Sequence, residues 1–156
     1  MFSGGADGKI FASDLNGKSS WSIPPVTQGK ATSRRIQQIS IRPNSSSDIL
    51  ASHSSSKDQF RLYDSRTRNC SAVFSIPLAS NLTKYIFHDW HPAGNIFVTG
   101  DHLSSSIHVF DVRKPDLRQE LKVHSAKVHA VKFFDSNNLF SASMDHRLAS
   151  TPFSFI

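Results

Sequence analysis

The chain has 156 residues, of which 38% are hydrophobic, and a formal net charge of +6 with neutral histidines. No apolar stretch reaches the roughly 20 residues that a membrane-spanning helix needs, and the composition is not that of a disordered chain. The single Cys70 excludes an internal disulfide and the N-terminus lacks a signal-peptide pattern, so we expect a nuclear or cytoplasmic protein that is not secreted.

Short strands separated by turns are predicted along the whole chain. The apolar runs are short and rich in Ile, Val, Phe and Tyr, and Gly, Ser, Asn, Asp and Pro bound them. No window carries the apolar stripe of a helix. In chain order, the segments that carry predicted strands are 9–13, 21–23, 39–44, 49–53, 59–64, 88–93, 96–100, 106–111, 131–136 and 139–143.

The strand pattern repeats along the chain. Segment 39–44 aligns with 88–93 and then with 131–136, at intervals of 49 and 43 residues. Each aligned segment is followed by a further short apolar run, so each unit reads as strand, turn, strand, polar turn and strand. A recurrence near this length indicates repeated supersecondary units.

A second repeated feature closes two of the strands. Segments 59–66 and 106–113 both end in an aromatic residue followed by Asp-x-Arg. Their aspartates, Asp64 and Asp111, are 47 residues apart, and Asp14 closes an earlier strand 50 residues before Asp64. The spacing of the closing aspartates therefore supports the same repeat.

These units resemble the WD-repeat β-propeller family, whose repeats of about 40–45 residues each form one four-stranded blade. The resemblance covers nearly the whole chain. It implies an all-β fold, a partial WD-repeat β-propeller, with two complete blades and a partial blade at either end. The implied units of this single domain are approximately 1–30, 31–80, 81–123 and 124–156.

The resemblance also implies a buried hydrogen-bonded network in the last unit. It would join His124 to the turn residue Asp145 and to a strand hydroxyl, Ser141 or Ser143, because buried polar groups need partners. The chain departs from the family at the strand-closing aromatic position. There Trp is replaced by Ser13, Tyr63, Phe110 and Thr151.

The length is too short for a closed ring, since closed propellers typically carry about 4–8 blades. We therefore expect a fragment, a truncated gene product or a splice form. An open arc would leave sheet edges uncovered, and exposed edges invite pairing with other chains. Self-association through the open edges is the predicted consequence.

The tandem Asp-x-Arg endings are the most specific indication of function in the sequence. Within the WD-repeat family they are similar to the motif by which substrate receptors dock on the propeller adaptor of cullin-four ubiquitin ligases. That resemblance implies a partner-binding set in which the aromatic anchors the strand end, Asp fixes the turn and Arg projects from one rim. The alternative is structural, with Asp as an ordinary strand ending and Arg paired locally. The set consists of Tyr63, Asp64, Arg66, Phe110, Asp111 and Arg113.

The excess of basic residues points to a competing class of partner. Eighteen Lys and Arg residues against 12 acidic ones could attract nucleic-acid phosphates, which makes a chromatin- or nucleic-acid-associated protein the alternative function. The basic residues are dispersed, however, which favours a solvated surface and weak nucleic-acid binding. They include Lys30, Arg34, Arg35, Arg66, Arg68, Arg113, Lys114, Arg118, Lys122, Lys127 and Lys132.

Catalytic and metal-binding motifs are lacking in the sequence. His88 and His91 stand three apart in a predicted strand, so their side chains should point to opposite faces. There is neither a glycine-rich phosphate loop nor a Gly-x-Ser-x-Gly elbow. The sequence therefore predicts a non-catalytic protein-interaction scaffold that needs no metal or cofactor.

Overall fold

A computed structural model describes residues 1–16, 20–25, 35–54, 58–76, 86–101 and 103–154, without the side chains of 116–118. The described residues are all-β, with 14 strands in four antiparallel sheets and no helix. The predicted all-β, partial propeller-like fold is thus confirmed. Two of the predicted unit limits, at residues 30 and 80, lie outside the described residues, so the unit boundaries stay a prediction.

Two sheets have four strands and two have three. The first sheet contains β1 (Phe2–Gly4), β2 (Ile10–Ser13) and β3 (Ser20–Ile23), and the second contains β4 (Ile36–Ile41), β5 (Asp48–His53), β6 (Phe60–Asp64) and β7 (Asn69–Phe74). The third contains β8 (His88–Trp90), β9 (Ile96–Gly100), β10 (Ser106–Asp111) and β11 (Lys114–Lys122). The fourth contains β12 (Val128–Phe133), β13 (Asn138–Ser143) and β14 (Leu148–Pro152).

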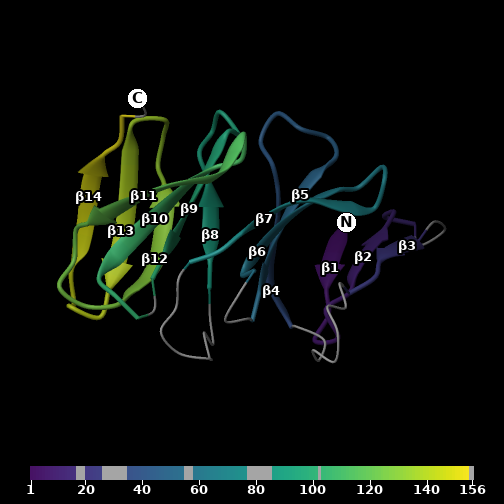
Figure 1. Cartoon of the computed structure of the whole chain (residues 1–156), viewed down its shortest axis with the longest axis horizontal. Coiled ribbons are helices and arrows are strands. Elements are labelled where there is room, and N and C mark those ends of the chain that lie inside the picture. Colours follow the sequence, from purple (N-terminus) through teal and green to yellow (C-terminus); the bar gives the residue numbers. More distant parts are fainter. Residues whose placement is uncertain (17–19, 26–34, 55–57, 77–85, 102, 155–156) are drawn as a thin grey trace.

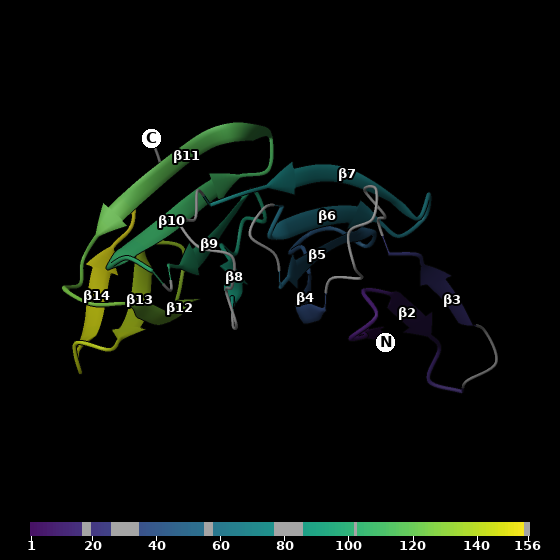
Figure 2. The same cartoon turned by 60° about the horizontal axis from the view of Figure 1, so that its bottom comes forward.

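The four sheets follow one another side by side in chain order, from purple to yellow (Figure 1). In each four-stranded sheet the strands are also ordered as in the chain, so consecutive strands are antiparallel neighbours. Figure 2 shows β7 and β11 along the same outer side of the arc. Strands β9 and β12 contact each other across the junction of the third and fourth sheets, as β1 and β4 do across the first junction. These contacts place β4 and β12 in equivalent positions, and β8 joins them because it is the first strand of its four-stranded sheet, as β4 is.

Aromatic side chains fill the junction between the second and third sheets. Phe97 and Phe110 stack with ring centroids 4.9 Å apart, and Phe60 packs against Phe97 at 5.3 Å. All three are fully buried, together with Phe74. Such pairs add about 0.5–1.5 kcal/mol each beyond the burial of their surface. The two central sheets therefore share one core.

Polar contacts repeat at the junctions. Gln38 of β4 donates to the carbonyl of His88 at 3.0 Å and accepts from its amide at 2.8 Å. At the next junction Asp89 of β8 binds the Lys132 ammonium and the amide of Phe133, both at 2.9 Å. A side chain of the first strand in one sheet thus forms hydrogen bonds with the first strand of the next sheet, from β4 to β8 and from β8 to β12.

The first sheet is offset by one strand from its neighbours. Strand β2 precedes Asp14 as β6 carries Asp64 and β10 carries Asp111, so β2 is equivalent to β6 and β10. By the same count β1 is equivalent to β5 and β9. Among the described strands, the first sheet therefore has none in the position that β4, β8 and β12 occupy. The fourth sheet likewise has no described equivalent of β7 and β11.

Candidate functional site

Asp64 closes β6 with a tight turn that also orients an arginine. Its carboxylate Oδ1 accepts from the backbone amide of Arg66 at 2.9 Å, the side-chain turn that Asp favours after a strand. The Arg66 guanidinium then returns to the same carboxylate with two bonds, Nε to Oδ1 at 3.1 Å and Nη2 to Oδ2 at 2.9 Å. The short Asp-x-Arg spacing makes this two-pronged contact possible.

The same geometry recurs at the end of β10. The Asp111 Oδ1 accepts from the amide of Arg113 at 2.9 Å and from its Nε at 3.0 Å, and Oδ2 accepts from Nη2 at 2.7 Å. The Asp111 side chain is 5% exposed and that of Asp64 is 20% exposed. The arginines face outward, with 74% of the Arg66 side chain and 56% of the Arg113 side chain exposed.

Asp14 forms the same turn after β2 without an arginine. Its Oδ1 accepts from the amide of Asn16 at 3.1 Å, so Asn16 holds the place of Arg66 and Arg113. The turn thus forms with either Asn or Arg in that place. The guanidinium is an addition to it, present in the two central sheets.

Each guanidinium is bound by its own aspartate and keeps N–H donors that this aspartate does not occupy. Arginine has five N–H donors, and the contacts with its own aspartate use two. Within the described residues, the remaining three N–H groups of Arg66 and of Arg113 have no other partner. The aspartates stay ionised, because the side-chain hydrogen bond from Arg66 lowers the pKa of Asp64 to about 2 and that from Arg113 lowers the pKa of Asp111. Each pair is therefore a fixed, exposed hydrogen-bond donor.

Both arginines lie on one rim of the two central sheets. The end of β4 contacts the end of β8, since Arg42 donates to the Gly94 carbonyl at 2.6 Å and Asn44 donates to the Pro92 carbonyl at 3.3 Å. Strands β4 and β8 therefore run in the same direction. Because β6 is parallel to β4, and β10 to β8, the turns after β6 and β10 share that rim. We call Arg42, Arg66 and Arg113 with their aspartates the arginine rim.

Arg42 was not singled out by the sequence, although it precedes a proline in the repeated segment. Besides Gly94, it binds Asp48 through Nη1 at 2.8 Å and Asn95 through Nη2 at 3.2 Å. Its repeat equivalent, His91, reaches the carbonyl of Ser136 in the fourth sheet at 2.9 Å. The alignment of Arg42 with His91 was the available signal, and it marks a joint between successive sheets.

The aromatic members of the predicted set are buried. Tyr63 packs in the core between the first and second sheets, and Phe110 packs in the core between the second and third. Burial raises the pKa of Tyr63 to about 12, and its hydroxyl lies 3.4 Å from His53 Nε2. These two residues can hold the turns in place, but they do not reach the surface where a partner would bind.

A Ser-His-Asp arrangement occupies the fourth sheet. His124 Nε2 lies 2.7 Å from Ser141 Oγ, and His124 Nδ1 lies 2.9 Å from Asp145 Oδ2. Burial opposes ionisation, yet hydrogen bonds from the Ser125 amide and from His124 lower the pKa of Asp145 to about 2. The expected network is therefore present, with Ser141 as the hydroxyl. Because Ser141 is 2% exposed, it offers no substrate access, and the network is structural.

The histidine pair of β8 is divided between two junctions. His88 faces the second sheet, where its Nε2 lies 2.6 Å from Ser40 Oγ, whereas His91 faces the fourth. They do not converge on one point. Across the described part of the chain, no three His, Cys, Asp or Glu side chains gather as a metal site requires.

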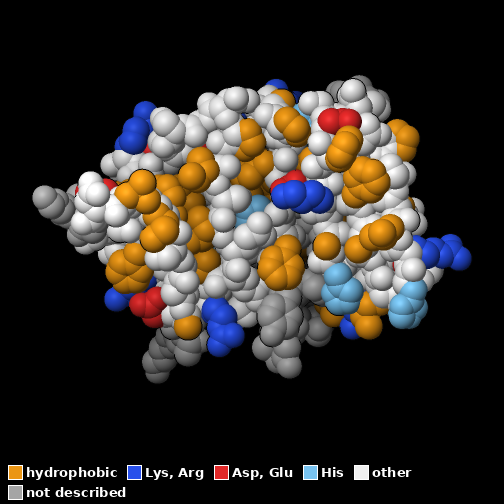
Figure 3. Space-filling view, turned by 180° about the vertical axis from the view of Figure 1, so that it is seen from behind, with side chains coloured by type: hydrophobic (Ala, Val, Ile, Leu, Met, Phe, Trp, Pro, Cys, Tyr) orange, Lys and Arg blue, Asp and Glu red, His pale blue; other side chains and the backbone are white. Residues whose placement is uncertain are grey.

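Basic side chains lie at separate places on the surface. Figure 3 shows Lys and Arg on one face divided by polar and hydrophobic groups. Arg68 lies over the Trp21 ring at 5.2 Å, and Lys132 pairs with Asp89. Lys30 and Arg34 are outside the described residues, as is the side chain of Arg118.

Comparison of the chain with protein-family models and with curated protein sequences finds no match. The part of the chain that the structure describes also contains no helix long and apolar enough to cross a membrane.

Proposed function

We propose that this protein is a non-catalytic protein-interaction platform of the WD-repeat propeller type. In the specific form of the proposal it is a substrate receptor that docks on the propeller adaptor of a cullin-four ubiquitin ligase through Arg66 and Arg113. The observation that carries the proposal is the matched pair of exposed arginines, each fixed by its own aspartate, on one rim of adjacent sheets.

The aspartates make the arginines suitable for docking. A free arginine side chain loses rotamer entropy when it binds, whereas a guanidinium already held by two hydrogen bonds has less to lose. The three remaining N–H groups of each arginine can bond to carboxylate or carbonyl oxygens of a partner. Local pairing and outward projection, which the sequence offered as alternatives, are therefore compatible.

Replacement of both arginines tests the proposal. Arg66→Ala with Arg113→Ala should abolish co-purification with the adaptor. The circular-dichroism spectrum and the melting temperature should stay nearly unchanged, because both side chains are exposed. Arg66→Lys with Arg113→Lys should restore little binding, since lysine keeps the charge but lacks the planar fork.

The matched control removes two exposed cations beside the site. Lys114→Ala with Arg68→Ala lowers the charge of the same region by the same amount and should leave adaptor capture intact. An equal loss of adaptor capture in the control and in the arginine variants would show that the interaction depends on net charge and not on these two arginines. Full adaptor capture by the double arginine variant would show that the two turns only end their strands and do not bind the adaptor.

A further inference from the structure

A serine in β7 follows two arginines at a spacing that arginine-directed protein kinases recognise. Arg66 and Arg68 stand five and three residues before Ser71. Such kinases bind upstream guanidinium groups with carboxylates along their substrate cleft, because charge-assisted hydrogen bonds between these groups are strong and directed. A short motif also occurs by chance, so its structural setting decides whether the serine can react.

Ser71 is exposed on β7, which runs along the outer side of the second sheet (Figure 2). In the ladder with β6, Leu62 pairs with Ala72 and the next residue, Tyr63, pairs with Cys70. Ser71 is therefore the extra residue of a β-bulge, which interrupts the ladder. Its hydroxyl donates to the Leu62 carbonyl at 3.1 Å. The hydroxyl thus lies at an irregular point of an exposed outer strand.

The segment around this serine is anchored in the core only beyond its two ends. None of residues 65–71 is buried, and only 65 and 70 among them are partly buried. By contrast, Tyr63 before the segment and Phe74 after it are buried in the core. Segments with few buried contacts open locally at low free-energy cost. The turn and the first half of β7 can therefore detach while the core stays packed.

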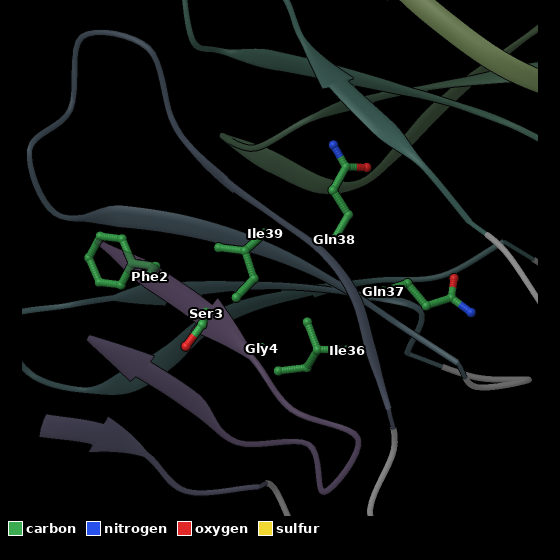
Figure 4. A pocket seen from close by; sticks show the side chains of 7 residues that line it. All are labelled: Phe2, Ser3, Gly4, Ile36, Gln37, Gln38 and Ile39. Carbon is green, nitrogen blue, oxygen red and sulfur yellow. The ribbon is translucent and has the colours of Figure 1, made fainter. Parts of the chain in front are cut away.

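The neighbouring first sheet restrains this segment weakly. On the inner side of the junction between the first and second sheets, a cavity of about 200 Å³ lies between β1 and β4. Figure 4 shows Ile36 and Ile39 of β4 pointing toward β1. On the outer side, the exposed Arg68 lies over the Trp21 ring, 5.2 Å from its centroid. A cation–π contact at an exposed site is weak, so this junction opposes opening of the turn only slightly.

The extended form that a kinase cleft requires is accessible to both arginines. Arg66 exchanges Asp64 for a carboxylate of the kinase, and Asp64, whose side chain is 20% exposed, becomes hydrated. Arg68 leaves a left-handed backbone conformation with φ of 59°, which is unfavourable for a residue with a side chain. Opening of the turn therefore replaces one carboxylate partner by another and relieves backbone strain.

We propose that Ser71 is the phosphorylation site of an arginine-directed serine/threonine kinase, which binds residues 66–71 after the start of β7 opens locally. The γ-phosphoryl group of Mg-ATP is transferred to Ser71 Oγ. The new O–P bond forms, the bond from the γ-phosphorus to the β–γ bridging oxygen breaks, ADP leaves, and the hydroxyl proton passes to the catalytic aspartate of the kinase. The inference does not depend on the proposed docking function, although both involve Arg66.

The phosphorylated side chain is incompatible with the closed strand. A phosphate carries about −1.5 to −2 charge at neutral pH and strong acceptor oxygens. It cannot donate the hydrogen bond that Ser71 gives to the Leu62 carbonyl, and its oxygens are repelled by that carbonyl. The modified strand therefore stays open at its start.

Purified protein kinase B, which prefers arginine at both upstream positions, is the probe, with Mg-ATP. We expect the intact folded chain to take up one phosphate, measured by intact mass and mapped to Ser71 by fragmentation. Ser45 and Ser150 are internal controls, because each has a single arginine three residues before it. Modification of either in preference to Ser71 would overturn the proposal, as would modification of a peptide of residues 64–75 without modification of the intact chain.

Matched variants separate recognition by the kinase from folding. Arg66→Gln and Arg68→Gln should each slow the modification about tenfold, since each removes a charge-assisted contact. Lys114→Gln removes an exposed cation outside the motif and Thr67→Ala removes a hydroxyl inside it, and both should react at the parent rate. Ser71→Ala should not react, whereas Ser71→Thr should still accept a phosphate at this position. Equal rates for Arg68→Gln and Lys114→Gln would overturn the proposal.

Two measurements test the route through local opening. Gly100→Ala destabilises the whole chain, because the added Cβ would lie 2.5 Å from the Val128 carbonyl oxygen, yet it should be modified at the parent rate. A rate that rises with the unfolded fraction would assign the modification to global unfolding and overturn the proposal. The amide of Arg68 donates to the Asp64 carbonyl at 2.7 Å in the closed turn, so it should exchange with deuterium several-fold faster after phosphorylation. Unchanged exchange would show that the phosphate fits the closed strand, and would also overturn the proposal.

Discussion

Ser40 of β4 and His88 of β8 join two sheets, with 2.6 Å between the serine Oγ and the histidine Nε2. The indole of Trp90 donates to the same oxygen at 2.8 Å. No described residue is a hydrogen-bond partner of His88 Nδ1, and the ring is buried against Phe60 and Phe97. Burial lowers the pKa of His88 to about 3, so the ring stays neutral in the folded protein.

The first prediction concerns acid stability. An unfolded histidine titrates near pH 6.5, whereas His88 in the folded protein resists protonation until about pH 3. The unfolded state therefore binds one more proton than the folded state between these values, and His88 lowers stability as pH falls from 6.5 toward 3, by up to about 1.4 kcal/mol per pH unit. Urea unfolding at pH 6.5, 5.5 and 4.5 should show a flatter pH dependence in His88→Gln.

An exposed histidine provides the control for this titration. His146→Asn suits the left-handed backbone at that position, where φ is 62°, and removes one histidine outside the core. If His88→Gln and the parent chain have the same slope between pH 6.5 and 4.5, burial of the neutral ring is not the source of the acid sensitivity.

The second prediction separates the turn from the arginine at Asp111. Asp111→Asn keeps an oxygen that can accept from the Arg113 amide, whereas Asp111→Ala leaves this amide without its side-chain acceptor. We expect the alanine variant to have the lower melting temperature, measured by circular dichroism. Arg113→Ala should melt close to the parent chain. A melting temperature for Arg113→Ala as low as that for Asp111→Ala would mean that the arginine itself holds the turn.

The third prediction concerns the close approach of β9 to β12. A Cβ atom on Gly100 would lie 2.5 Å from the carbonyl oxygen of Val128, a contact with backbone that cannot move aside easily. Gly100→Ala should destabilise the protein by about 1–3 kcal/mol in urea unfolding, the usual cost of overpacking. Ser150→Ala, on an exposed strand position, should change stability by less than about 0.5 kcal/mol. Equal stabilities of the two variants would show that the strands can separate at low cost.

The fourth prediction concerns nucleic acid. The net charge of +6 should give weak, sequence-indifferent binding to duplex DNA that disappears near physiological salt. Binding isotherms across a salt series test this, with a poly-anion such as heparin as the matched competitor. Tight binding that persists at physiological salt would favour the nucleic-acid-associated alternative over the protein platform.

The fold was predictable because its signals are local. Strand alternation and the Asp turns depend on neighbouring residues, so Asp14, Asp64 and Asp111 marked their strand ends correctly. The joints between sheets were not predictable in this way, since Arg42 meets Gly94 only after about 50 residues of chain have folded back. Arg61 shows a second limit. It is 3% exposed beside Asp58, whereas a charged residue in an alternating strand is expected to face water.

The candidate site was predictable only in part for the same reason. The sequence shows an arginine two residues after Asp64 and after Asp111, so the local pairs could be predicted. The burial of Tyr63 and Phe110 could not, because each packs against the sheet that precedes its own in the arc. Arg66 and Arg113 share a rim because β4 and β8 run in the same direction. The relative direction of two strands in different sheets cannot be predicted from a short segment of sequence.

The three bonds of Arg42 bind its own sheet to the next one. If the third sheet opened locally, Arg42 would lose Gly94 and Asn95 and keep Asp48. Its guanidinium would then rely on water for the lost partners, and the aromatic core between the sheets would be exposed at the same time. The second and third sheets therefore form one cooperative unit, whose amides should exchange with solvent through a common opening and not sheet by sheet.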